Sequence, residues 1–183
     1  MSITDYFSTG KFDFSLICRN NAKKFILEQK ISAEIFIEIL QQQEEKKQIP
    51  LIVILDSLVE DHPDFLNNSM GSFIEIAIET LNETAKRCIS RIFYHLLKNQ
   101  TYLFSSLQKE QLIALHFDWL IKPSLVATRV NCISVLFYLR HEEDWITADL
   151  LAIIENELLK NEPSFRSRAT KVIRKIEKNQ SRL

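Results

Sequence analysis

The chain has 183 residues, of which 46% are hydrophobic and 26% charged, and it contains only two glycines and four prolines. A chain of this length can bury a core of its own, and the scarcity of glycine argues against glycine-rich phosphate loops and hairpin-rich sheets. Lysine and arginine number 23 against 24 aspartates and glutamates, so the net charge of −1 provides no overall attraction to nucleic acid.

The cysteines and the N-terminal residues predict a cytoplasmic protein without a membrane segment. Cys18, Cys88 and Cys132 are odd in number and form no CxxC pair, so neither a zinc clamp nor a secreted disulfide framework is expected. Residues 1–12 lack a basic segment followed by an apolar one, which is the pattern of a secretory signal. The longest apolar run, residues 49–55, is far shorter than the ~20 residues of a membrane span.

Apolar residues recur at helical spacing along almost the whole chain, and no stretch alternates with period two. In residues 88–97 and again in 31–40 they fall on one face of a helix. Residues 49–59 are apolar nearly all round, which is typical of a helix packed between neighbours, and residues 62–71 predict a longer loop. The pattern predicts an all-α protein with helices at residues 12–29, 31–43, 48–61, 69–82, 84–99, 106–121, 124–140, 144–160 and 163–178.

Several of these predicted helices begin at residues that favour a helix start. Ser32 suits an N-cap, and Ser105 with Gln108 has the spacing of a capping box. Ser124 predicts another start, and Pro163 stands where a proline is tolerated in the first turn.

An internal repeat is the strongest signal in the sequence. Residues 88–94 reappear 44 residues later as residues 132–138, with five of the seven positions identical and a sixth changed from Ile to Leu. Ala169 continues the frame 37 residues further on, and Leu51 and Ala22 continue it towards the N-terminus. A period of this length accommodates two helices, which is typical of an array of helical hairpins.

The second helix of each predicted hairpin carries the pattern Arg-x-x-small-x-x-x-aliphatic. It occurs at Arg19–Ala22, Arg129–Cys132 and Arg166–Ala169, while Ala85–Cys88 lacks the arginine. In this pattern the chain resembles the HEAT-like α-solenoid superfamily, although its turns read Asn-Glu where HEAT units carry aspartate. The resemblance implies a right-handed α–α superhelix, a HEAT/ARM-like solenoid of about four helical hairpins plus an N-terminal helix, in a single domain at residues 1–183.

The repeat frame also brings polar residues of different second helices into line. In solenoids of this type the second helices usually line the concave side, so we expect one surface with Tyr94 and Tyr138 stacked. Tyrosine and arginine are enriched at binding hot spots. We call this set the basic/tyrosine ridge and expect it to bind a partner: Arg87, Arg91, Tyr94, Asn131, Tyr138, Arg168 and Lys175. The alternative is an ordinary solvated face with the two tyrosines half buried by repeat packing.

The last two predicted helices carry opposite charge. The basic residues of the last are Arg166, Arg168, Lys171, Arg174, Lys175, Lys178 and, beyond it, Arg182. The acidic residues around the helix before it are Glu142, Glu143, Asp144, Asp149, Glu155, Glu157 and Glu162. Antiparallel packing predicts a self-neutralising end hairpin, and the alternative is a surplus of positive charge that binds an acidic protein or a nucleic acid backbone.

The titratable residues give no catalytic or metal-binding pattern. Cys88 and Cys132 occupy the small-residue position of the repeat and are expected to be buried, unreactive thiols. The four histidines lie on different segments, and neither HExxH nor ExxH occurs. No cofactor and no metal are therefore expected.

One enzymatic alternative follows from fold analogy alone. Some DNA glycosylases that excise alkylated purines are HEAT-like arrays with Trp, Asp and Arg on the concave face. The residues available for that role are Asp118, Trp119, Arg129 and Trp145, and their spacing matches no motif.

The sequence thus favours a non-catalytic helical-repeat scaffold that binds an acidic protein or peptide through the basic/tyrosine ridge. Nucleic-acid binding, including the glycosylase activity, is kept as the alternative.

Overall fold

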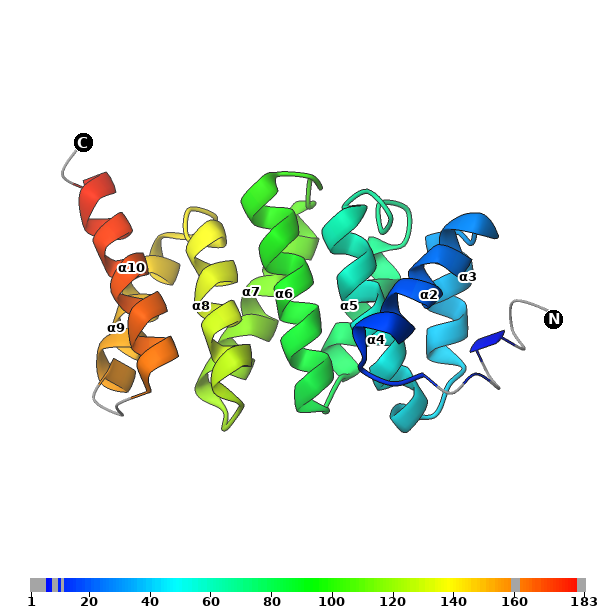
Figure 1. Ribbon diagram of the computed structural model, residues 1–183. Coiled ribbons are helices and arrows are strands. Elements are labelled where there is room, and N and C mark those ends of the chain that lie inside the picture. The colour runs from blue at the N-terminus through cyan, green and yellow to red at the C-terminus, as the bar shows by residue number, and fades with distance from the viewer. Residues whose placement is uncertain (1–5, 8–9, 11, 159–161, 181–183) are drawn as a thin grey trace. The chain divides into compact units, whose positions relative to one another are not determined.

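The computed structural model describes residues 6, 7, 10, 12–158 and 162–180. These residues form nine α-helices, labelled α2 to α10, and within them no strand occurs (Figure 1). The prediction of an all-α protein is therefore confirmed for the part of the chain that the structure describes.

The chain divides into two compact units, Met1–Ile92 and Phe93–Leu183, and the division falls inside α6 (Glu83–Asn99). The first unit contains α2 (Leu16–Glu28), α3 (Ala33–Gln41), α4 (Glu45–Asp61) and α5 (Met70–Glu79). The second unit contains α7 (Ser106–Ile121), α8 (Val126–Leu139), α9 (Asp144–Leu158) and α10 (Pro163–Gln180). That the chain is a single domain remains a prediction.

Each predicted helix has a counterpart in the structure, and the differences lie at the ends. The largest is at α2, where the sequence predicts a start at residue 12 but the helix begins at Leu16. The reason is Ser15, whose hydroxyl accepts a hydrogen bond from the Cys18 N–H at 3.2 Å and caps the helix there. The last two residues of the predicted helix 144–160 lie outside the described residues.

The helix starts predicted from capping residues are confirmed with one exception. Ser32 caps α3, and Ser105 with Gln108 forms the capping box of α7. The exception is Ser124: the N-cap of α8 is Leu125, whose extended backbone places its carbonyl 3.1 Å from the Arg129 N–H. Helix α10 begins at Pro163, as predicted.

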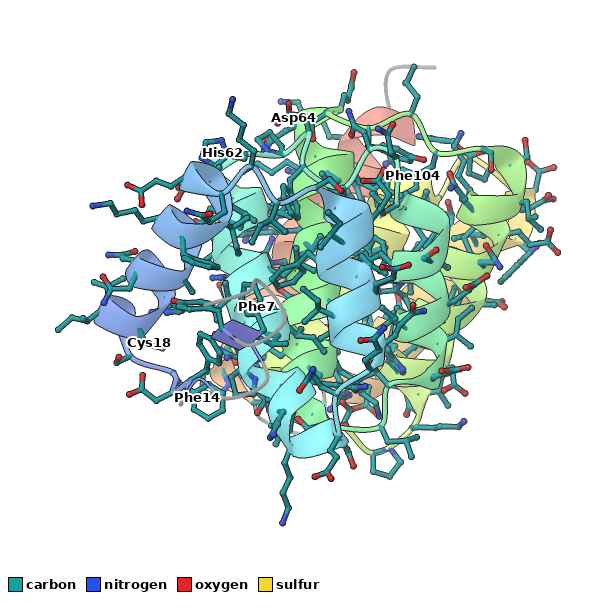
Figure 2. All side chains as sticks on the ribbon, turned by 90° about the vertical axis from the view of Figure 1, so that its right-hand side faces the viewer. Phe7, Phe14, Cys18, His62, Asp64 and Phe104 are labelled. Carbon is teal, nitrogen blue, oxygen red and sulfur yellow. The ribbon has the colours of Figure 1, made fainter. Side chains whose placement is uncertain are left out.

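In the first unit the packing centres on α4. All of its residues from Leu51 to Val59 are buried, in agreement with the apolar pattern of this segment, and both α2 and α3 pack against the helix. An ion pair between Lys23 and Asp61, at 2.6 Å, joins the edges of α2 and α4. Figure 2 shows Phe7 inside the unit; its ring meets that of Phe36, with the centroids 5.5 Å apart.

In the second unit the packing centres on α8. Helices α7, α9 and α10 all pack against it, and α10 also packs against α9. In Figure 1, α8 and α10 face the viewer while α7 and α9 lie behind them. The buried faces of α8 and α10 include Cys132, Leu136 and Ala169, which are the repeat positions that the sequence assigns to the core.

A buried histidine lies in the core of the second unit. His116 of α7 is fully buried between the rings of Phe93 and Trp119, at centroid distances of 5.7 and 5.6 Å. Its Nδ1 lies 2.7 Å from the carbonyl oxygen of Leu112, and its Nε2 has no partner among the described residues. Burial lowers the pKa of His116 to about 4, with the bond to Leu112 opposing the shift, so the imidazole is neutral in the folded protein at pH 7.

This burial predicts a loss of stability in mild acid. Because the unfolded chain takes up a proton on His116 near pH 6.5 and the folded chain does so only near pH 4, stability falls as the pH drops through this window. Between pH 7 and pH 5 we expect wild type to lose about 2 kcal/mol more than His116→Leu. The free energy of unfolding is measured by urea titration followed through tryptophan fluorescence.

The exposed His141 provides the control, since His141→Leu removes a histidine of the same unit without touching the core. This variant is expected to follow the wild-type pH dependence. Parallel pH curves for wild type and His116→Leu would contradict the prediction.

Candidate partner-binding site

A pocket of about 210 Å³ in the second unit brings together four residues of the basic/tyrosine ridge. Tyr94 comes from the C-terminal part of α6, Tyr138 from α8, and Arg168 and Lys175 from α10. We call this the basic pocket; its lining residues are Tyr94, Ser134, Phe137, Tyr138, Arg168, Lys171, Val172, Arg174 and Lys175. The pocket therefore combines aromatic and aliphatic side chains with four cationic ones, which we call its rim.

The two tyrosines touch but do not stack. Their ring centroids are 6.1 Å apart and their planes are tilted by 47°. The expectation of two stacked tyrosines is therefore wrong. The Tyr94 ring instead contacts two cations: Arg168 lies 5.3 Å and Lys98 lies 5.7 Å from its centroid.

Arg168 also lowers the pKa of one of the two tyrosines in the pocket. Burial alone raises the pKa of the Tyr94 hydroxyl, but the hydrogen bond and positive charge of Arg168, together with Lys98, outweigh burial and lower it. Burial raises the pKa of Tyr138, with the hydroxyl of Tyr94 adding to the effect. The two hydroxyls of the pocket thus have pKa values that are shifted in opposite directions.

The positive charge of this rim is not compensated locally. Within the described residues no carboxylate lies within 4.0 Å of Arg168, Lys171, Arg174 or Lys175. Helix α9 does not neutralise these four cations, so the predicted self-neutralising hairpin is wrong for them.

Two carboxylates of the last hairpin are instead held by the buried guanidinium of Arg129 on α8. It forms salt bridges with Glu157 and, at 3.1 Å, with Glu162, the two carboxylates at the junction of α9 and α10. At the other end of α9, Glu142 pairs with Lys109 of α7 at 2.8 Å. The predicted cation Arg182 lies outside the described residues.

The remaining ridge residues have different surroundings. Arg91 belongs to the first unit, where its Nε lies 2.9 Å from both carboxylate oxygens of Asp56 and its Nη2 lies 3.7 Å from Glu60. The Asp56 side chain is only 4% exposed; burial raises the pKa of its carboxyl group, and the hydrogen bonds from Arg91 oppose that shift. Arg87 is exposed on α6, and Asn131 is half-buried on α8.

The basic/tyrosine ridge predicted from the sequence does not include three residues of this pocket: Lys171 and Arg174, which belong to the predicted basic helix, and Phe137, which belongs to the repeat. The spacing of Arg168, Lys171 and Lys175, three and four residues apart, is the signal that places them on one face of α10. The pairing of Arg91 with Asp56 leaves no comparable signal, because Asp56 stands in a buried apolar run.

The residues considered for a glycosylase each have a structural partner. Asp118 forms a salt bridge with Lys122 at 2.6 Å, and Arg129 is held by two glutamates. Trp119 is buried beside His116, and Trp145 packs against the ring of Phe117.

Comparison with known proteins adds no assignment, since no family model matches the chain and neither a curated protein nor a solved structure is detectably similar to it.

In the described residues no group of three or more His, Cys, Asp or Glu side chains is arranged to hold a metal ion. None of the helices that the structure describes combines the length and apolar character needed to span a bilayer.

The Asp56–Arg91 pair yields an asymmetric mutational prediction. Arg91→Leu leaves a carboxylate buried without its partner, so we expect a loss of about 3 kcal/mol in the free energy of unfolding. Asp56→Leu is expected to cost less, because the Arg91 side chain is 37% exposed and also reaches Glu60. The double variant is expected to be more stable than Arg91→Leu alone.

Urea denaturation of the two single variants and the double variant tests this, with exposed Arg87→Leu on the same helix as the control. Additive losses in the double variant would show that the pair is not coupled.

The three cysteines yield a labelling prediction. Cys88 and Cys132 are buried, and burial raises the pKa of the Cys88 thiol to about 12, whereas Cys18 is only half-buried. We expect a disulfide reagent to label Cys18 first in the native protein, and the other two thiols only on unfolding. Cys18→Ser is expected to remove the early phase; rapid labelling of this variant would refute the assignment.

Proposed function

We propose that the chain is a non-catalytic helical scaffold of the HEAT-like α-solenoid type, which binds an acidic protein or peptide through the basic/tyrosine ridge. The observation that carries this proposal is the basic pocket, where four cations without a neighbouring carboxylate surround aromatic side chains. Of the other ridge residues, Asn131 of α8 belongs to the same unit as the basic pocket, and Arg87 and Arg91 belong to the first unit.

The order in which the helices pack supports the solenoid. Within the first unit α2 packs beside α4 and α3 beside α5, and within the second unit α8 packs beside α10. Helices two apart in the sequence are thus neighbours in each unit, as expected when hairpins stack and share one core.

The chemistry of the basic pocket supports an acidic partner with an apolar or aromatic anchor. Guanidinium groups such as those of Arg168 and Arg174 bind carboxylates through paired hydrogen bonds. Phe137, Tyr138 and Val172 provide apolar surface for a side chain between those charges. Because helices hold these groups in place before binding, little ordering cost is added on association.

Peptide selection followed by site-directed variants tests the proposal. Random peptides are selected against the protein at low salt, and the enriched sequences are synthesised and titrated by fluorescence anisotropy. We expect net negative peptides whose affinity falls at least about tenfold in Arg168→Glu/Lys175→Glu, because each substitution replaces attraction by repulsion. Tyr138→Ala is expected to weaken the same peptides.

The matched control is Lys24→Glu/Lys46→Glu, which reverses two exposed charges of the first unit, and circular dichroism verifies equal helicity. Peptides that bind the basic-pocket and control variants equally well would refute the site. Micromolar binding of DNA or RNA with a steep salt dependence would instead support the nucleic-acid alternative.

A further inference from the structure

A second surface of the second unit lies between α7 and α9. Two adjoining pockets of about 480 and 370 Å³ share Ala114 and Trp145 and together form one groove along these helices. We call it the α7–α9 groove. Helix α7 has 16 residues and is about 24 Å long, so the groove has the length of about four helical turns.

The floor of this groove is apolar and open to solvent. Trp145 is 48% exposed and Ile121 67% exposed, although both are large apolar side chains. The ring of Trp145 packs against that of Phe117, with the centroids 5.4 Å apart, and this contact holds the indole in place along the groove. Between them the exposed Ala114 of α7 and Ala152 of α9 are small enough to let a partner side chain approach the floor.

The rim of the groove is acidic. Glu110, Glu142, Glu143 and Asp149 line it, and Lys109 is its one cation among the described residues. Lys109 is engaged by Glu142, and within the part of the chain that the structure describes no basic group lies within 4.0 Å of Glu110, Glu143 or Asp149. An apolar floor between uncompensated carboxylates is complementary to an amphipathic helix with basic flanks.

A second copy of the chain does not supply such a helix from α10, its most basic element. The apolar face of α10, which consists of Phe165, Ala169, Val172 and Ile176, is buried inside its own unit. The exposed surface of α10 is mostly charged and polar, and its apolar residues outside the buried face are the exposed Pro163 at its start and the half-buried Ile173, which are too few to cover the floor of the groove.

We propose that the α7–α9 groove binds a basic amphipathic helix of a partner protein, which places apolar side chains against Ala114 and Trp145 and lysines or arginines beside the acidic rim. This site is independent of the basic pocket, which takes ligands of the opposite charge.

The test uses display-selected peptides of about four helical turns. Peptides are selected on wild type and counter-selected on Ala114→Arg, which fills the middle of the groove from an exposed position. We expect enriched peptides with net positive charge and apolar residues at helical spacing, each losing at least about tenfold in affinity on Ala114→Arg. Their binding is also expected to shift the emission of Trp145 to shorter wavelength, and Trp145→Phe removes this signal while Trp119 stays buried.

Charge variants keep the test independent of any disturbance caused by Ala114→Arg. Glu143→Lys/Asp149→Lys reverses the rim and is expected to abolish binding, whereas Glu155→Lys, an exposed acid of α9 outside the groove, is expected to leave it unchanged. The proposal is overturned if no enriched peptide depends on Ala114, or if the dependent peptides are acidic. It is also overturned if sedimentation shows a dimer of the chain that Trp145→Asp dissociates.

Discussion

Two helices, α4 and α8, are buried on nearly all sides. Helices α2 and α3 pack against α4 in the first unit, and α7, α9 and α10 pack against α8 in the second. From Leu51 to Val59 every residue of α4 is buried, and the same holds for α8 from Cys132 to Phe137. An apolar surface of this width exceeds what one neighbouring helix covers, so each central helix needs several. The surfaces that remain for binding are therefore the outer faces of the covering helices and the hollows between them.

The same burial explains why the charge of the second unit is unevenly distributed. Arg129 occupies a buried position of α8, and its charge is tolerated there because Glu157 and Glu162 accept its hydrogen bonds. Glu157 and Glu162 are therefore engaged in the core of the unit and do not pair with the four cations of the basic pocket. The second unit thus combines a buried ion-pair network around Arg129 with a basic hollow beside α10 and an acid-rimmed groove between α7 and α9.

Much of this organisation is predictable from the sequence because it depends on local patterns. The capping box of Ser105 and Gln108 predicts the start of α7 to the residue, and Ser32 is correctly predicted as the N-cap of α3. The repeat between residues 88–94 and 132–138 aligns Tyr94 with Tyr138, whose rings are in contact. The ion pair of Arg91 with Asp56 is not predictable in this way, since periodicity does not show which helices face each other. Nor does it show that, in the described part of the chain, no carboxylate lies within 4.0 Å of Arg168, Lys171, Arg174 or Lys175. The solenoid handedness and the binding role of the ridge remain predictions.

For the acidic partner that we propose for the basic pocket, the contact of Arg168 with Tyr94 sets a threshold. In the free protein the guanidinium already has a partner, so an anion that recruits it competes with the tyrosine ring and hydroxyl. A cation–π contact at such a site is worth about 0.5–1 kcal/mol, which lowers the affinity roughly two- to fivefold. A ligand with a single weakly bound carboxylate loses to this competition most of the binding free energy that Arg168 offers. A ligand with two adjacent carboxylates keeps most of that free energy, so the internal contact favours densely charged ligands.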